Sequence, residues 1–260
     1  MIITTVHHPS PNLEEQAHET AKSLMLPFVA RENHSLAALK AQYHTENILV
    51  MTTQGPLVHT AGGEYFFHLS MADLRIKNLT NGKHDHMVTA MGLQPGMSVL
   101  DCTLGLASDA VVASFVTGEG GTVVGLEVSP AVAMIAQYGL ANFVGDDERI
   151  TTALRRIQVK NIDYDSYLAG LPPGSFDIIY LDPMFRCPVV TSANVKPLRY
   201  LADMRPVSRA AIEQACRVAK QRVVIKEAHE SPEFKRLGIT NLTGGKYSSV
   251  QYGVIPAGSH

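Results

Sequence analysis

The stretch that decides the fold is SVLDCTLGLASDAVVASFV, residues 98–116. Its apolar start, 98–100, has the composition of a buried strand, and 108–116 is expected to form a helix. The same alternation continues along the chain. Further strands are expected at 122–126, 157–159, 176–181 and 222–225, and further helices at 130–143 and 208–219. Strands that alternate with helices predict a mainly parallel sheet with helices on both faces, which is a doubly wound α/β fold.

The first 70 residues follow a different pattern and predict a small α+β region. Apolar residues at helical spacing alternate there with short β-prone runs that are bounded by glycine and proline. The elements expected are helices over 12–26 and 36–43 and strands over 48–51 and 65–67. We therefore divide the chain into an N-terminal region, 1–70, a second domain, 71–256, and a tail, 257–260.

The composition excludes several classes of protein. Apolar residues make up 45% of the 260, enough for a sizeable core, and the formal net charge is −2. Cys102, Cys187 and Cys216 are far apart, so neither a disulfide framework nor a zinc site is expected, and a reducing cytoplasm fits best. No apolar segment reaches the roughly 18 residues of a membrane span. His84 and His86 do not share a helix face, so we expect a polar helix start there and no metal site.

Polar residues follow three of the expected strands, in the place where parallel sheets bind ligands. Gly105 lets the first loop approach a ligand closely, but the loop lacks the other glycines of the G-x-G-x-x-G pattern that binds a dinucleotide. Asp101 and Asp109 beside it suit a cationic or amine-bearing ligand. Glu127 stands where an acid accepts ribose hydroxyls, and Asp163 where a side chain reaches an adenine amino group.

Together these three strand ends predict S-adenosylmethionine, with its amino-acid part at the Gly105 loop. Each residue has a simpler explanation when it is taken alone. A loop with one glycine occurs by chance, Glu127 is then a solvated strand end, and Asp163 is a helix cap. Their order on successive strands favours the cofactor.

The fourth strand ends in YLDPMF, residues 180–185, and predicts the reaction. Asp-Pro-Met-Phe resembles the [Asn/Asp/Ser]-Pro-Pro-[Tyr/Phe] signature of enzymes that methylate exocyclic or amide nitrogens. The lone pair of such a nitrogen is delocalised, so acceptors on its hydrogens stabilise the charge that develops during transfer. Asp182 and the Pro183 carbonyl are the expected acceptors, and Phe185 is expected to stack on the base. The alternative is that Asp-Pro only ends the strand in a turn.

Four segments carry a resemblance to a known family. They are DCTLGLASDA at 101–110, YLDPMF at 180–185, MADLRIK at 71–77 followed by Gly82-Lys83, and RVVIK at 222–226. The first is similar to D-A-T-A-G-L-G-R-D-A, and the second matches Y-L-D-P-M-F, in the RsmJ (YhiQ) family of class I methyltransferases. Members of this family methylate a guanine N2 in 16S ribosomal RNA. The resemblance covers about residues 65–255 and implies a seven-stranded, Rossmann-like methyltransferase sheet.

The resemblance also implies the cofactor and its contacts. S-adenosyl-L-methionine is the expected cofactor and S-adenosyl-L-homocysteine the expected product. The residues expected to hold it are Asp101, Thr103, Gly105, Ser108, Asp109, Glu127, Val128, Asp163 and Asp182. The residues expected to act in catalysis are Asp182, Pro183 and Phe185. Ser108 and Val128 stand where the family has arginine, Asp163 where it has serine, and Arg186 where it usually has proline.

Basic residues after the catalytic motif indicate a place for RNA. Between Arg186 and Arg222 the chain has eight Lys or Arg and two acids, a local charge of +6. A second basic cluster precedes the first strand of the sheet. The expected RNA contacts from the two groups are Arg75, Lys77, Lys83, Arg186, Lys196 and Arg199. The alternative is that these cations line an ordinary solvated surface.

The first hypothesis is therefore an N-methyltransferase that acts on a guanine amino group in ribosomal RNA or the small ribosomal subunit. A second keeps the cofactor but takes a small molecule or a protein side chain as substrate. A third is a relative that binds the cofactor without catalysis. The sequence leaves the oligomeric state open.

Overall fold

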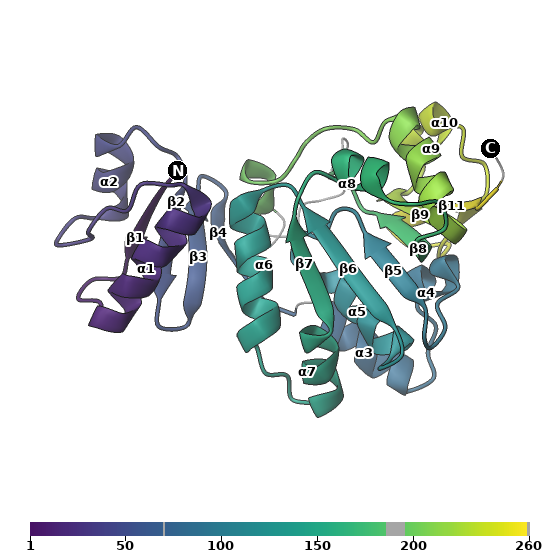
Figure 1. Cartoon of the computed structure of the whole chain (residues 1–260), viewed down its shortest axis with the longest axis horizontal. Coiled ribbons are helices and arrows are strands. Elements are labelled where there is room, and N and C mark those ends of the chain that lie inside the picture. Colours follow the sequence, from purple (N-terminus) through teal and green to yellow (C-terminus); the bar gives the residue numbers. More distant parts are fainter. Residues whose placement is uncertain (70, 186–195, 259–260) are drawn as a thin grey trace.

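The computed structural model describes residues 1–69, 71–185 and 196–258. Their strands form a four-stranded sheet near the N-terminus and a seven-stranded sheet in the rest of the chain (Figure 1). The N-terminal sheet and the last strand of the chain lie on opposite sides of the molecule in this view.

The large sheet has the strand order β10-β11-β9-β8-β5-β6-β7. Its strands are β5 (Ser98–Asp101), β6 (Thr122–Glu127), β7 (Ile157–Asn161), β8 (Phe176–Leu181), β9 (Ala219–Ala228), β10 (Leu242–Thr243) and β11 (Val250–Pro256). The strands β5 to β9 pair in parallel, whereas β11 pairs antiparallel with both β9 and β10. The chain winds outward in one direction from β5 and in the other from β8, so the order reverses between these neighbours. This confirms the predicted doubly wound, mainly parallel sheet of seven strands.

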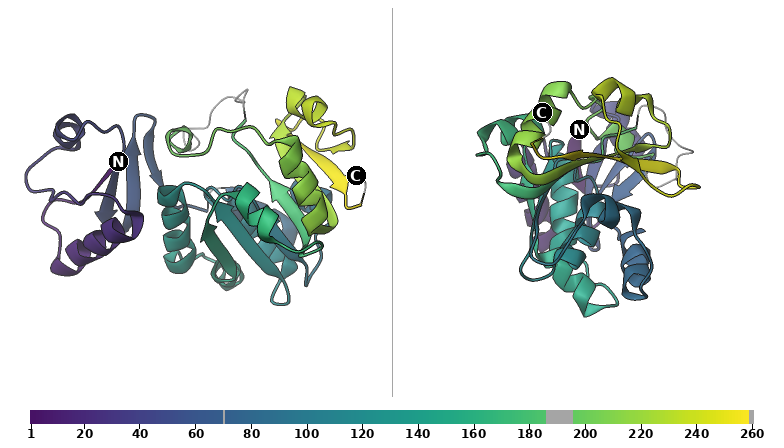
Figure 2. Two further views of the ribbon diagram at one scale, coloured as in Figure 1. Left: turned by 45° about the horizontal axis from the view of Figure 1, so that its top comes forward. Right: turned by 90° about the vertical axis from the view of Figure 1, so that its right-hand side faces the viewer.

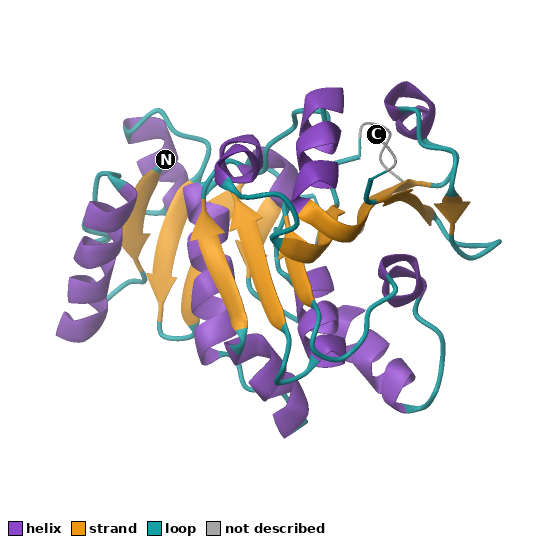
Figure 3. Cartoon of the chain, turned by 45° about the vertical axis from the view of Figure 1, so that its right-hand side comes forward, coloured by secondary structure: helices purple, strands orange, loops and turns teal. Residues whose placement is uncertain are grey.

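Helices cover both faces of the large sheet (Figure 3). One face carries α3 (Met71–Thr80), α4 (His86–Met91), α5 (Ser108–Thr117) and α7 (Glu148–Arg155). The other carries α8 (Tyr164–Gly170), α9 (Arg209–Val218) and α10 (Pro232–Leu237). A short 3-10 helix, η1 (Leu198–Tyr200), precedes α9. No helix in the described ranges is long and apolar enough to cross a membrane.

The apolar run of β8 is explained by burial on both faces. Ile178 and Tyr180 pack in the core beneath α5, and Ile179 and Leu181 pack in the core beneath α9. Successive strand residues point to opposite faces, so a strand covered on both sides must be apolar throughout. The run ends at Leu181 because the next residue, Asp182, has left the two cores.

The N-terminal region is a four-stranded sheet of order β1-β2-β3-β4 with two helices. Its elements are β1 (Ile2–Thr5), α1 (Pro11–Leu24), α2 (Leu36–Gln42), β2 (Ile48–Thr52), β3 (Gly55–Thr60) and β4 (Gly63–Phe66). Both predicted helices are present, and the predicted strands correspond to β2 and β4. We did not expect β1 and β3. The glycine and proline that begin β3 indicated a break, yet Pro56 pairs with Met51 at the start of an antiparallel ladder.

A third core joins this region to the large sheet through α6 (Pro130–Asn142). Ile3 and Leu49 of the small sheet share that core with Val132 and Ile135 of α6. Figure 2 shows α6 between the two sheets. Phe67, just after β4, packs on the same helix, where a methyl group placed on Gly139 would lie 1.8 Å from its Cγ. A glycine inside α6 therefore makes room for the aromatic ring.

We expect Gly139→Ala to lower the free energy of unfolding by about 1–3 kcal/mol, the usual effect of overpacking. Alanine favours a helix over glycine by about 1 kcal/mol, so helix propensity alone would raise the free energy of unfolding. A fall would therefore show that the clash with Phe67 outweighs helix propensity. Gly170→Ala is the matched control, because nothing lies within 4 Å of the added methyl group. Urea unfolding of both variants checks this. An equal change in the free energy of unfolding in the two variants would contradict the packing explanation.

Asp85 begins α4, as the sequence predicted for the His84-Asp85-His86 triplet. Its carboxylate accepts a hydrogen bond from the Val88 N–H at 3.0 Å, so it is the N-cap of the helix. Cys102 and Cys216 are buried free thiols, and Cys187 lies outside the described residues.

Candidate functional site

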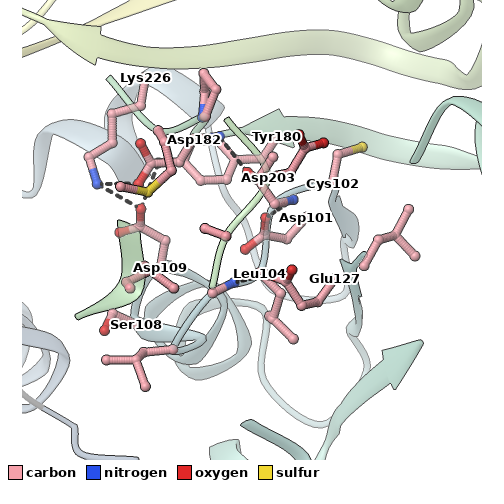
Figure 4. Close-up of a pocket in the computed structure, with 18 of the residues that line it drawn as sticks. Asp101, Cys102, Leu104, Ser108, Asp109, Glu127, Tyr180, Asp182, Asp203 and Lys226 are labelled. Atoms are coloured by element: carbon pink, nitrogen blue, oxygen red, sulfur yellow. Dashed lines mark hydrogen bonds and ion pairs between the residues drawn. The ribbon is translucent and has the colours of Figure 1, made fainter. Parts of the chain in front are cut away.

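A cavity of about 610 Å³ opens at the carboxyl ends of β5, β6 and β8, where the strand order reverses. Figure 4 shows the side chains that converge on it. Its volume is in the range of small-molecule sites. Of the predicted cofactor and catalytic residues, it is lined by Asp101, Thr103, Gly105, Ser108, Asp109, Glu127, Val128, Asp182, Pro183 and Phe185. The fold therefore brings together residues that are up to 84 positions apart in the sequence.

The loop after β5 ties three strand ends together. Gly105 has a φ of +52°, which glycine adopts without strain, and its N–H donates to Oε2 of Glu127 at 3.1 Å. The Thr103 N–H donates to Oδ1 of Asp101 at 3.0 Å. The Thr103 hydroxyl in turn accepts from the Asp182 N–H at 2.6 Å. The loop thus sets the positions of the acids on β5, β6 and β8.

Glu127 is buried at the end of β6, and both of its oxygens accept backbone hydrogen bonds. Besides Gly105, the Ser129 N–H donates to it at 2.9 Å. Burial raises the pKa of the carboxyl group, although these hydrogen bonds oppose the rise. Each carboxylate oxygen has a second lone pair, so Glu127 can accept two further hydrogen bonds from hydroxyls in the cavity.

Asp101 is only 2% exposed, yet it lines the cavity. Burial raises the pKa of its carboxyl group to about 8, and the negative charges of Asp109 and Asp182 raise it as well. A carboxyl group in this state is stabilised in its ionised form by a cation that comes close to it. The floor of the cavity therefore favours a cationic ligand.

A cluster of two cations and three carboxylates lies at one side of the cavity. Figure 4 shows its members Lys226, Asp182 and Asp109. Lys226 Nζ lies 2.8 Å from Oδ2 of Asp182 and 3.0 Å from Oδ2 of Asp109. Arg75 joins Asp109 to Asp85, and it contacts Asp85 through two hydrogen bonds of 2.7 and 2.9 Å. The Tyr180 hydroxyl donates to Asp109 at 2.7 Å.

The charges in this cluster set the protonation of Asp109. Burial alone would raise the pKa of its carboxyl group, but Lys226 and Arg75 outweigh burial and hold the pKa well below its usual range. Asp109 is therefore a stable carboxylate. It anchors the two cations rather than acting as an acid.

The other side of the cavity is mostly apolar. Leu126, Ile162 and Tyr164 form its wall near Glu127, and Leu198 and Ala202 cover it from the segment that includes η1. This is a surface on which a flat heterocycle packs well.

Asp163, the predicted adenine contact, caps α8 and does not line the cavity. Its Oδ1 accepts from the Asp165 and Ser166 N–H groups, and its Oδ2 is paired with Arg205. The alternative explanation from the sequence, a helix cap, is thus correct. Its contact with a ligand stays a prediction, since its neighbours Ile162 and Tyr164 are the residues that line the wall.

The predicted RNA contacts differ in their surroundings. Arg75 lies within the ion cluster with only 18% of its side chain exposed, and Arg199 donates to the Phe185 carbonyl at 2.8 Å. Lys77 is exposed and pairs with Asp73 on the same helix. Lys83 and Lys196 are also exposed. Arg186 lies outside the described residues.

The other basic residues between 205 and 222 contact acids or backbone carbonyls of the protein. Arg205 pairs with Asp163 and Asp203, Arg209 donates to the Arg236 carbonyl, and Arg217 donates to the carbonyls of Leu168 and Leu171. Lys220 pairs with Asp177, and Arg222 contacts the Ala90 carbonyl. Each of these five cations thus has a partner within the protein, and its contact with RNA stays a prediction.

Lys226, Tyr252 and Leu198 are among the cavity residues that sequence reasoning missed. Lys226 directly follows the predicted fifth strand, so the same inspection of strand ends that found Asp182 would have found it. Tyr252 is brought in by β11, which inserts next to β9. Leu198 is held over the cavity by the N-terminal region, where the Asn47 side chain donates to the Tyr200 carbonyl at 3.3 Å. The last two depend on tertiary packing.

The residues of the cavity fit the predicted S-adenosylmethionine. Asp101 at the floor suits its ammonium and sulfonium charges, Glu127 its ribose hydroxyls, and the wall of Leu126, Ile162 and Tyr164 its adenine. When bound, this cofactor supplies a methyl group already activated on a sulfonium.

Comparisons with known proteins agree with this fit. A family model described as "Putative SAM-dependent methyltransferase" matches residues 59–246. The uncharacterized protein YpiP of Bacillus subtilis is 37% identical to this chain over 98% of both sequences. The ribosomal RNA small subunit methyltransferase J of Pseudomonas syringae is 28% identical over 94% of this chain and 87% of its own. That of Buchnera aphidicola is 31% identical over 64% of this chain and 67% of its own.

Among solved structures, a SAM-dependent methyltransferase from Neisseria gonorrhoeae has the same fold. It matches 100% of this chain and 97% of its own with a TM-score of 0.67 and 18% identity. The fold, the residues around the cavity and the match of the family model over residues 59–246 agree. The chain belongs to this family of SAM-dependent methyltransferases.

Proposed function

We propose that the protein methylates the N2 amino group of a guanine in small-subunit ribosomal RNA. Asp182 carries the proposal, because it stands at the edge of the cofactor cavity with 27% of its side chain exposed. Relatives at 28% and 31% identity are named as methyltransferases of small-subunit ribosomal RNA, which supports this class of substrate.

The motif Asp182-Pro183-Met184-Phe185 has free acceptors for an amino group. Within the described part of the chain, no hydrogen bond uses Oδ1 of Asp182 or the carbonyl of Pro183. Acceptors at these two positions hold the two hydrogens of an NH2 group and stabilise the positive charge that develops on its nitrogen. Phe185 also lines the cavity and offers a ring for stacking, which is worth about 1–3 kcal/mol per base.

The chain needs no strong general base for this reaction. Methylation replaces one N–H of the amino group by N–CH3, so the nitrogen becomes more acidic as the new bond forms and its proton then leaves. A carboxylate at hydrogen-bond distance accepts that proton or passes it to water. Positioning of the nitrogen against the methyl group accounts for most of the remaining rate acceleration.

A second candidate is methylation of a small molecule or a protein side chain by the same site. It is favoured by the contacts that Arg205, Arg209 and Arg217 make within the protein, which leave fewer of their N–H groups for a phosphate backbone. The exposed Lys83 and Lys196 remain available for RNA.

Deletion of the gene should remove one N2-methylguanosine per small-subunit RNA. Mass spectrometry of nucleosides from ribosomal RNA of the deletion strain and the parent measures this. The wild-type gene should restore the nucleoside, and the same gene with Asp182→Ala should not, which ties the loss to the site. An unchanged nucleoside profile would overturn the proposal and leave the second candidate.

A further inference from the structure

Lys226 occupies a position beside Asp182 that the register of the sheet dictates. Leu181 of β8 is paired with Ile225 of β9, so the residues that follow them, Asp182 and Lys226, are also neighbours. Lys226 is paired in turn with Tyr252 of β11. Because side chains alternate along a strand, Lys226 lies on the same face as Val224, which packs in the core beneath α5. Asp109, at the start of α5, lies there too.

The ammonium group of Lys226 lies between two carboxylates, those of Asp109 and Asp182. It lies 3.0 Å from Oδ2 of Asp109, which is itself fixed by the Tyr180 hydroxyl and by Arg75. It lies 2.8 Å from Oδ2 of Asp182. Figure 4 shows Lys226 reaching both carboxylates. One oxygen of Asp182 is thereby committed to lysine, and the other remains for a substrate.

We propose that Lys226 is a positioning residue for methyl transfer, which fixes the Asp182 carboxylate by its Oδ2 and keeps it ionised so that Oδ1 accepts the substrate N–H. This rests on the proposed function of Asp182 as the acceptor for an amino group. Lys226 itself need not touch the substrate, because its effect passes through Asp182.

The charges around Asp182 show why a cation is needed there. Burial raises the pKa of its carboxyl group, Lys226 lowers it, and Asp109 raises it again, with a net rise. Arg75 also lowers this pKa. The charge of Asp182 in turn raises the pKa values of Tyr180, Tyr252, Asp101 and Glu227. Loss of the lysine charge would leave burial and Asp109 with less opposition. A larger fraction of Asp182 would then be protonated at neutral pH, and a protonated carboxyl group accepts a hydrogen bond from an N–H group less well than a carboxylate does.

The test compares Lys226→Met and Lys226→Arg with Lys220→Met. Lys220 is on the same strand but pairs with Asp177, away from the cavity, so its loss should leave the pH–rate profile unchanged. In Lys226→Met the acid limb of the kcat profile should move to higher pH by about one unit or more, and below the shifted pKa kcat should fall about tenfold for each unit of pH. A rise in pH should recover much of this loss. Lys226→Arg keeps the charge and should restore the profile.

A second readout needs no substrate. The pKa of Asp182, followed by NMR in protein with 13C-labelled aspartate carboxyls, should rise in Lys226→Met and stay near the wild-type value in Lys226→Arg. An unchanged pKa in Lys226→Met would overturn the inference, as would a fall in kcat that no pH restores. If the pKa rises but the wild-type protein methylates no RNA, the proposed substrate fails while the coupling stands. Lys226→Gln replaces the methionine variant if that one does not fold.

Discussion

Asp182→Ala should lower methyl transfer to unmodified small-subunit RNA by about 10²–10³-fold, the loss typical of removing one preorganised polar group from a transition state. The effect should fall on kcat, because the acceptor matters most when charge develops on the nitrogen. The affinity for S-adenosylmethionine should change far less, since Asp101, Glu127 and the apolar wall remain in place. Transfer of a labelled methyl group measures the first quantity, and titration calorimetry the second.

Asp165→Ala is the control for Asp182→Ala. Asp165 is an acid on α8, but 46% of its side chain is exposed, and with the described residues that side chain makes one long contact of 4.0 Å, to Arg205. Its loss should leave kcat within about twofold. Full activity of Asp182→Ala would show that Asp182 is not the acceptor. Loss of cofactor binding in that variant would instead assign Asp182 to the cofactor.

The affinity for S-adenosylmethionine should rise with pH between about pH 6 and 7, by up to tenfold per unit for one proton released. Asp101 is the expected source, because burial raises the pKa of its carboxyl group to about 8 and the free protein therefore holds it protonated in this window. The positive charge of the ligand favours the ionised form, so binding expels the proton. Asp101→Asn should remove this proton release and weaken binding about 10–100-fold, the range of a hydrogen bond to a charged group.

Calorimetry in two buffers that differ in ionisation enthalpy measures the proton release directly. The comparison with Asp101→Asn is needed because burial also raises the pKa values of Glu127 and Asp182. The raised pKa of Asp101 also affects the stability of the free protein. A carboxyl group whose pKa is raised on folding makes the fold less stable as pH rises from about 4 to about 8. Equal proton release in the wild type and in Asp101→Asn would assign it to another group.

The sequence was sufficient for the core of the fold and for the acids of the cavity. Buried parallel strands are short apolar runs, and their carboxyl ends meet at one edge of the sheet, so Asp101, Glu127 and Asp182 were predictable from their place in the chain. The motif at 180–185 predicted the type of reaction, methyl transfer to an amino nitrogen, because its residue types suit such a nitrogen.

Several features were decided only by the tertiary structure. β3 begins with Gly-Pro and takes its pairing from its neighbours rather than from its own composition. β1, Ile-Ile-Thr-Thr, is β-prone in composition, but its parallel pairing with β2 is set by the fold. Arg205 and Arg217 seemed free in the sequence because two of their partners, Asp163 and the Leu171 carbonyl, lie more than 40 positions away. A count of charged residues along the sequence does not show which of them will pair with other groups in the folded protein.

The sequence by itself determined the alternation of strands and helices, and with it the line of strand-end acids, since both depend on local composition and on the rule that parallel strands share one edge. Only the tertiary structure placed Lys226 between Asp109 and Asp182, Tyr252 beside them and Leu198 over the cavity. Those contacts depend on strand register and on the docking of the N-terminal region, which arise from packing between distant segments. The acids are thus encoded locally, whereas their protonation is a property of the whole fold.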